Sequence, residues 1–113
     1  MMLVHDGNEI AYWRKANAIH KWFVDNVQDG VDDCGDYKVT KEHLIQLHNI
    51  CNEILVDHNL AEQLLPTQSG FFFGNTEYDM WYYNDLENTK QIIDEILEYK
   101  PYCLNELYYS SSW

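Results

Sequence analysis

Basic residues are scarce in this sequence of 113 residues. Lys and Arg number 7 and Asp and Glu number 19, so the formal net charge at pH 7 is −12. Binding to a phosphate backbone, or to an anionic membrane surface, needs clustered Lys and Arg, and both kinds of partner are therefore disfavoured. The acidic excess suits a partner protein with a basic surface, or it simply keeps the protein in solution.

Cysteines are also few, and they are widely spaced. Cys34, Cys51 and Cys103 form no Cys-x-x-Cys pair and their number is odd, which argues against a disulfide framework and against a structural zinc site. The first residues lack the apolar stretch of a signal peptide, and no apolar run reaches the length of a membrane span. We therefore expect three free thiols and a cytoplasmic protein.

Motifs that would identify an enzyme are missing as well. The sequence contains no Gly-x-Ser-x-Gly, no phosphate-binding loop and no dinucleotide fingerprint. Cys34 is the most attractive thiol, but the carboxylates of Asp32 and Asp33 beside it disfavour the reactive thiolate. His43 and His48 diverge around a helix, so they do not form a metal pair. We expect no cofactor and no metal site, and catalysis stays an open question.

Hydrophobic periodicity predicts three helices, over residues 8–26, 40–56 and 76–99. Asn8, Thr40 and Thr76 are the expected N-caps, and Pro101 stops the third helix. The core is predicted to contain Tyr12, Ile19, Phe23, Leu47, Ile54, Leu86, Ile93 and Leu97.

The remaining segments are predicted to be mostly irregular. Residues 29–38 form a loop, and residues 57–75 are irregular except for a short strand at Phe71 to Phe73 between two glycines. The tail from Glu106 favours an extended form that could pair with this triplet. The expected fold is a single domain over residues 1–113, mostly α, with a compact three-helix core and at most a small two-stranded β element.

The first predicted helix carries the main candidate site. An acid, an indole, an amide and an imidazole fall within an arc of about 80° on it; they are Glu9, Trp13, Asn17 and His20. Arg14 and Lys21 lie just beyond. Such an edge can hold a ligand or a partner side chain, and it can equally be a buried hydrogen-bonded network. Further candidate binding residues are Asp33, Cys34, Phe72, Tyr78 and Asp79.

Four segments resemble a family of short proteins encoded by tailed bacteriophages. They are YWRKANAIHKWF (12–23), VQDGVDDC (27–34), LLPTQSGFFFG (64–74) and YSSSW (109–113), and the resemblance spans almost the whole chain. The family has no assigned reaction, so the resemblance implies an origin and a bacterial host cytosol rather than a mechanism.

Two functional hypotheses follow. The first is an accessory phage protein that binds and modulates or inhibits a host or anti-phage defence component, because short acidic phage proteins often act in this way. The second is a small-ligand protein, either a sponge for a nucleotide-like signal or a minor enzyme, which would use the Glu9, Trp13, Asn17 and His20 edge beside the locally basic Arg14 and Lys21.

Overall fold

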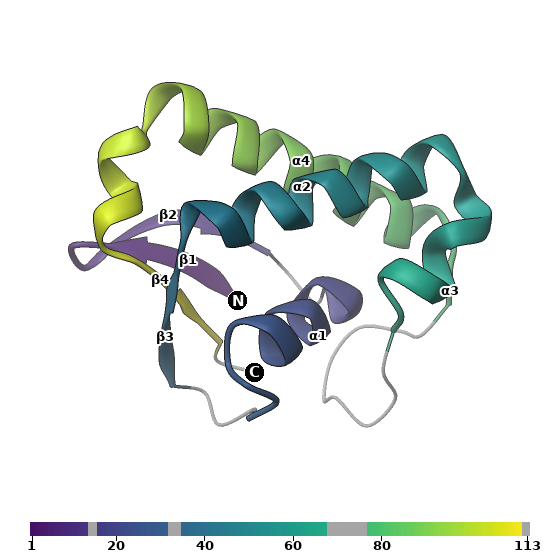
Figure 1. Ribbon diagram of the computed structural model, residues 1–113, viewed down its shortest axis with the longest axis horizontal. Helices are drawn as coiled ribbons and strands as arrows, with labels where there is room; N and C mark the ends of the chain where they lie inside the picture. Colours follow the sequence, from purple (N-terminus) through teal and green to yellow (C-terminus); the bar gives the residue numbers. More distant parts are fainter. Residues whose placement is uncertain (14–15, 32–34, 68–76, 112–113) are drawn as a thin grey trace.

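A four-stranded antiparallel sheet and two long helices dominate the computed structural model, which describes residues 1–13, 16–31, 35–67 and 77–111 (Figure 1). The strands are β1 (Met2–His5), β2 (Asn8–Tyr12), β3 (Asp36–Val39) and β4 (Leu107–Ser110). The α-helices are α1 (Asn17–Asn26), α2 (Lys41–Val56), α3 (Ala61–Leu64) and α4 (Met80–Tyr99), and short 3₁₀ turns cover His58–Leu60 and Pro101–Asn105.

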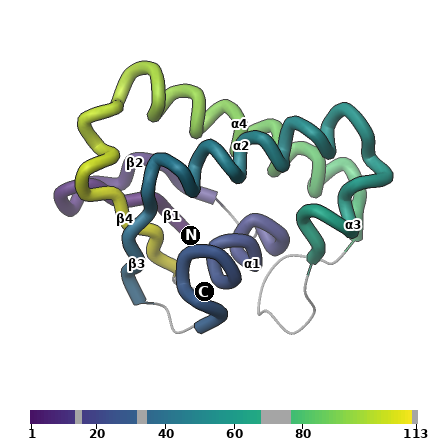
Figure 2. The backbone as a smooth tube through the Cα atoms, in the orientation of Figure 1, coloured from purple at the N-terminus to yellow at the C-terminus, as the bar shows by residue number. Residues whose placement is uncertain are grey.

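The sheet is the main correction to the expected fold. Its strand order is β2-β1-β4-β3, and every neighbouring pair is antiparallel. The prediction of a three-helix core with at most a two-stranded element is therefore wrong, and the protein is α+β. The strands come from both ends of the chain, and the pairing of Met2 with Ser110 brings those ends together (Figure 2).

The first predicted helix, over residues 8–26, divides into β2 and α1. Asp6 and Gly7 both have positive φ angles, 51° and 77°, as a two-residue turn between antiparallel strands requires. Asn8 therefore pairs with His5 in the sheet instead of capping a helix. Tyr12 was predicted to lie in the core because its spacing from Ile19 and Phe23 fits a helix. It ends strand β2 instead, and its side chain is 53% exposed.

The second predicted helix is confirmed, and its start explains why. Thr40 accepts a hydrogen bond from the backbone N–H of His43 at 3.2 Å, and the Thr40 N–H donates to Nδ1 of His43 at 3.1 Å. The sequence predicted the Thr40 half of this reciprocal cap, and His43 takes the place that Glu or Gln has in the usual pattern.

The third predicted helix is confirmed in position but begins later than expected. It starts at Met80, because the Asp79 carboxylate accepts hydrogen bonds from the N–H groups of Trp81 and Tyr82. Thr76, the expected cap, lies outside the described residues. The helix ends at Tyr99, shortly before Pro101.

The tail is extended, as predicted, but its partner differs from the expected one. Strand β4 lies between β1 and β3, so both of its edges are already hydrogen-bonded. The suggested partner, Phe71 to Phe73, lies outside the described residues.

The core lies between the sheet, α1 and the α2–α4 pair. Helices α2 and α4 pack side by side, and α1 lies beneath them (Figures 1 and 2). Most of the α1 side chains are buried, which marks it as a central helix rather than a surface one. Six of the predicted core residues are fully enclosed, namely Ile19, Phe23, Leu47, Ile54, Leu86 and Ile93. Leu97 is only partly buried.

Among the described residues, none of the helices has both the length and the apolar character needed to cross a membrane.

Candidate functional site

Three residues of the predicted edge, Trp13, Asn17 and His20, lie in the protein interior. Trp13 is 2% exposed, Asn17 5% and His20 0%. The Trp13 indole N–H donates to Oγ1 of Thr89 on α4 at 2.9 Å, and Nδ1 of His20 lies 2.6 Å from the hydroxyl of Tyr109 on β4. Buried polar groups that find partners inside the protein stabilise its fold. The geometry therefore favours a buried hydrogen-bonded network over a ligand-binding edge for these three residues.

Aromatic packing reinforces this buried network. The Tyr109 ring stacks on Phe23 with centroids 3.9 Å apart and planes 7° apart. Trp13 lies 5.7 Å from Phe23, and Trp22 meets Phe23 edge-on at 5.2 Å. Such pairs add to the stabilisation from burial alone. Through these contacts α1 packs against the central strand β4.

The other sequence-predicted residues that the structure describes do not join this cluster. Glu9 is exposed on β2, so it shares no helix with Trp13. Lys21 forms an ion pair with Asp25 one turn along α1. Tyr78 accepts a hydrogen bond from the N–H of Thr67 at 3.2 Å, and Asp79 caps α4. The remaining four candidates, Arg14, Asp33, Cys34 and Phe72, lie outside the described residues.

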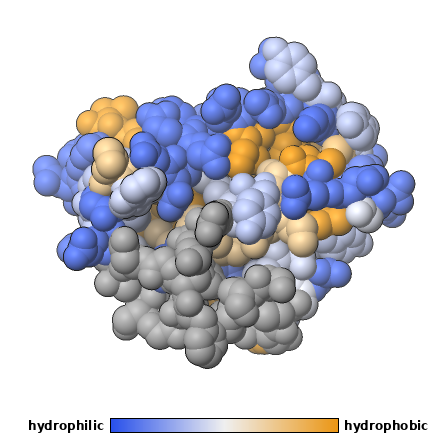
Figure 3. Space-filling view, turned by 180° about the vertical axis from the view of Figure 1, so that it is seen from behind, coloured by the Kyte–Doolittle hydropathy of each residue, from blue (hydrophilic) through white to orange (hydrophobic). Residues whose placement is uncertain are grey.

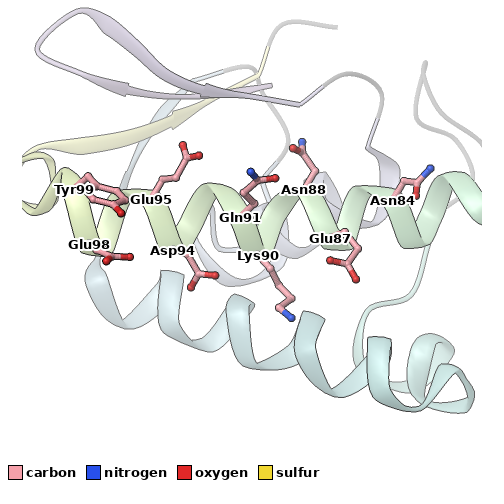
Figure 4. Close-up of a pocket in the computed structure, with 9 residues that line it drawn as sticks. All are labelled: Asn84, Glu87, Asn88, Lys90, Gln91, Asp94, Glu95, Glu98 and Tyr99. Carbon is pink, nitrogen blue, oxygen red and sulfur yellow. The ribbon is translucent and has the colours of Figure 1, made fainter.

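The outward face of α4 is a surface that the sequence analysis did not single out. It forms a shallow groove of about 610 Å³, shown in Figure 4. All the lining residues come from this one helix: Asn84, Glu87, Asn88, Lys90, Gln91, Asp94, Glu95, Glu98 and Tyr99. Four of them are carboxylates and only Lys90 is cationic, so the face is strongly acidic. We call these nine residues the α4 face.

Helix α2 borders the α4 face on one side (Figure 4). The Lys90 ammonium donates to Oδ1 of Asn52 at 3.0 Å, and Nε2 of His48 lies 2.9 Å from Oδ1 of Asp94. Within the described part of the chain, Glu87, Glu95 and Glu98 have no ion-pair partner. Their charges are therefore available to a basic partner.

Large apolar side chains stand at both ends of the α4 face. Met80 is 65% exposed and Trp81 66% at the start of the helix, and Tyr99 is 70% exposed at its end. Elsewhere on the rear of the molecule, hydrophobic side chains reach the surface in patches among hydrophilic ones (Figure 3). Exposed aromatics beside charges are typical of protein-binding surfaces.

Asp85 lies on α4 but does not belong to this face. Burial, with a further contribution from the charge of Asp79, raises the pKa of the Asp85 carboxyl to about 6. At neutral pH a carboxyl with this pKa is still mostly ionised, and it is its partial burial that separates Asp85 from the exposed acidic surface.

The described cysteines have no reactive character. Burial raises the pKa of the Cys51 thiol to about 12, so it packs as a small hydrophobic residue. Cys51 and Cys103 are both free thiols in the interior. Cys34, the thiol favoured by the sequence, lies outside the described residues.

A second hollow, of about 310 Å³, lies at the sheet. Its walls include Val4 and Tyr108, together with the acids Asp6, Asp36 and Glu106. These carboxylates do not converge, since no group of three or more His, Cys, Asp or Glu in the described ranges could hold a metal ion. The α4 face is the larger of the two surfaces and the better supplied with exposed binding groups.

Comparison with protein-family models, with curated proteins and with solved structures gives no match to this chain. The resemblance to short bacteriophage proteins therefore stays a prediction.

Proposed function

We propose that this protein is a small acidic binding protein that engages a basic surface of another protein through the α4 face. The supporting observation is the concentration of Glu87, Asp94, Glu95 and Glu98 on one exposed helix surface with a single ammonium among them. Complementary charge accelerates association and selects among partners. A face of this kind suits the recognition of another protein.

The resemblance to phage proteins makes the proposal more specific. The partner is a host or anti-phage defence component of the bacterial cytosol, which the protein modulates or inhibits. The small-ligand alternative loses its main support, because Trp13 and His20 are buried and hydrogen-bonded inside the protein. Exposed Glu9 alone does not make a pocket.

A pulldown from bacterial lysate with matched charge variants tests the proposal. The test variant carries Glu87→Gln, Asp94→Asn and Glu98→Gln, which neutralise three carboxylates of the α4 face. The control carries the same number of neutralised acids at exposed positions on other elements, Glu42→Gln, Glu53→Gln and Glu62→Gln. Both variants have the same net charge.

A true partner is retained by the wild type and by the control and is lost with the test variant. Its binding should also weaken as salt rises through the physiological range, because screening weakens contacts between exposed charges. Equal loss with both triple variants would mean that net charge alone is responsible. Binding that ignores both salt and the α4 variant would overturn the proposal.

A further inference from the structure

One face of the four-stranded sheet packs against the helices, and the other lies toward solvent. Leu3 and Tyr109 are both 0% exposed and belong to the inner face. Because successive side chains of a strand alternate between faces, their neighbours Val4 and Tyr108 lie on the opposite side, where Tyr108 is 38% exposed. The hollow of about 310 Å³ lies on this side, since Val4, Tyr108 and Ser110 line it. We call the solvent side the outer sheet face.

The register of the strands arranges the side chains of the outer sheet face in two rows that cross all four strands. Read from β2 to β3, the first row is Glu9, Val4, Tyr108 and Lys38. The second row, in the same order, is Tyr12, Met2, Ser110 and Asp36. The first row therefore has an acid at one edge, a base at the other edge and two largely apolar side chains between them.

The two charges of the first row lie too far apart to pair with each other. They are separated by three strand spacings, or about 14 Å. Among the residues that the structure describes, neither Glu9 nor Lys38 takes part in an ion pair, and both are exposed. Such a row is complementary to itself, because a two-fold rotation about an axis parallel to the strands places the acidic edge opposite the basic edge.

We infer that the occupant of the outer sheet face is the same face of a second copy of this chain. The two-fold axis runs parallel to the strands, between β1 and β4. In this arrangement Glu9 of each copy faces Lys38 of the other, and Val4 faces Tyr108. In the second row the hydroxyl of Tyr12 faces the carboxylate of Asp36, which accepts hydrogen bonds. The inference goes beyond the proposed function, because the outer sheet face includes no residue of α4.

The size and charge of the outer sheet face limit the strength of this dimer. A patch of four short strands covers roughly 20 by 14 Å, on the order of 300 Å², whereas a standard interface buries about 800 Å² per partner. At the turn end of the hollow, Asp6 of one copy faces Glu106 of the other, and these two acids repel each other. We therefore expect a weak dimer, with a Kd on the order of 100 μM.

Charge exchange within the first row tests this arrangement. Lys38→Glu places acids opposite each other, and Glu9→Lys does the same with bases. The double variant carries both substitutions, so it restores opposite charges across the dimer and keeps the net charge of the wild type. Lys41→Glu and Glu53→Lys, at exposed positions on α2, are the controls with the same changes in net charge.

Sedimentation equilibrium of the full chain at physiological salt, between about 10 μM and 1 mM, measures the Kd of each protein. The repulsion due to the overall negative charge is largely screened there beyond about 8 Å, so contacts at the face dominate. We expect each single substitution in the first row to raise the Kd at least about tenfold and the double variant to return it to within about threefold of the wild type. The two controls should leave the Kd nearly unchanged.

Tyr108→Ala removes the largest apolar contact of the first row and should also raise the Kd severalfold. Far-ultraviolet circular dichroism checks that every variant keeps its fold, which exposed positions should allow.

Three results would overturn the inference. The first is a wild-type chain that stays monomeric up to about 1 mM. The second is association that Lys38→Glu leaves intact, which would place the contact elsewhere. The third is a double variant that associates no better than the single ones, since the two charges would then not face each other. If net charge alone governs association, Glu9→Lys will strengthen it as much as Glu53→Lys does, which would also contradict the arrangement.

Discussion

Thr89→Val tests whether the contact between α4 and the segment before α1 stabilises the fold. Valine keeps the shape of threonine but loses the hydroxyl that accepts the Trp13 indole N–H at 2.9 Å. Thr89 is 0% exposed and Trp13 2%, so water cannot replace the lost acceptor. A buried donor without a partner costs about 1–3 kcal/mol, and we expect a loss of unfolding free energy in that range.

The hydroxyl of Thr89 also donates to the carbonyl oxygen of Asp85 at 2.6 Å. Losing that bond should matter less, because the same carbonyl keeps its regular helix bond from the Thr89 N–H. A double-mutant cycle separates the two effects. In a Trp13→Phe background there is no indole N–H to leave unpaired, so Thr89→Val should cost less than about 0.5 kcal/mol there. The coupling between the two positions should then be about 1 kcal/mol or more.

Urea unfolding followed by far-ultraviolet circular dichroism measures all four proteins without depending on tryptophan emission. The slope of unfolding free energy against urea should stay constant, so that shifts in midpoint report stability. Each kcal/mol lost should lower the Tm by roughly 4–8 °C in a domain near this size. Additive effects of the two substitutions would refute the reasoning, since they would show that the Trp13–Thr89 bond carries no stability of its own.

Three further predictions concern the core, pH and thiols. Ile93→Ala should cost about 2–5 kcal/mol by chemical denaturation, because it leaves a cavity in the core, whereas Ile45→Ala, at a 40% exposed position on α2, should cost far less. The folded-state pKa of Asp85, about 6, lies above its usual value of 3.8, so the folded protein favours the protonated carboxyl. The stability that this protonation contributes is complete below pH 3.8 and is lost as pH rises through 6. Asp85→Asn should therefore raise the Tm at pH 7 and flatten its dependence on pH between these values, while Glu62→Gln, at an exposed position, should not. Thiol titration in denaturant without reductant should count all three cysteines, and a count of one would reveal a disulfide.

The parts of the fold that sequence patterns predicted are those with local causes. Helix α2 follows from the reciprocal cap at Thr40 and from a buried stripe that repeats within one segment. The sheet could not be predicted in the same way, because its central pairing joins His5 to Leu107 across nearly the whole chain. The turn at Asp6-Gly7 was the one local clue to a hairpin, and the helical period that follows it concealed the signal.

The candidate site shows a similar division. Helical spacing correctly brought Asn17 and His20 together on α1 but did not reveal that this helix is enclosed on most sides. Their burial depends on β4, which arrives from the other end of the chain. The α4 face could have been predicted from the sequence, because it is the side of the helix opposite the buried stripe. That stripe, which contains Leu86 and Ile93, was predicted correctly. The residues of the same helix that lie outside that stripe are the ones that form the α4 face.

The position of β4 between β1 and β3 has a consequence for synthesis on the ribosome. Until residues 107–110 leave the exit tunnel, the N-terminal hairpin has an open edge and β3 has no partner at all. Unpaired strand edges can join other chains, and pairings across long loops form slowly. A nascent chain halted before Leu107 would thus hold two separate β segments, and only β4 would join them into one sheet.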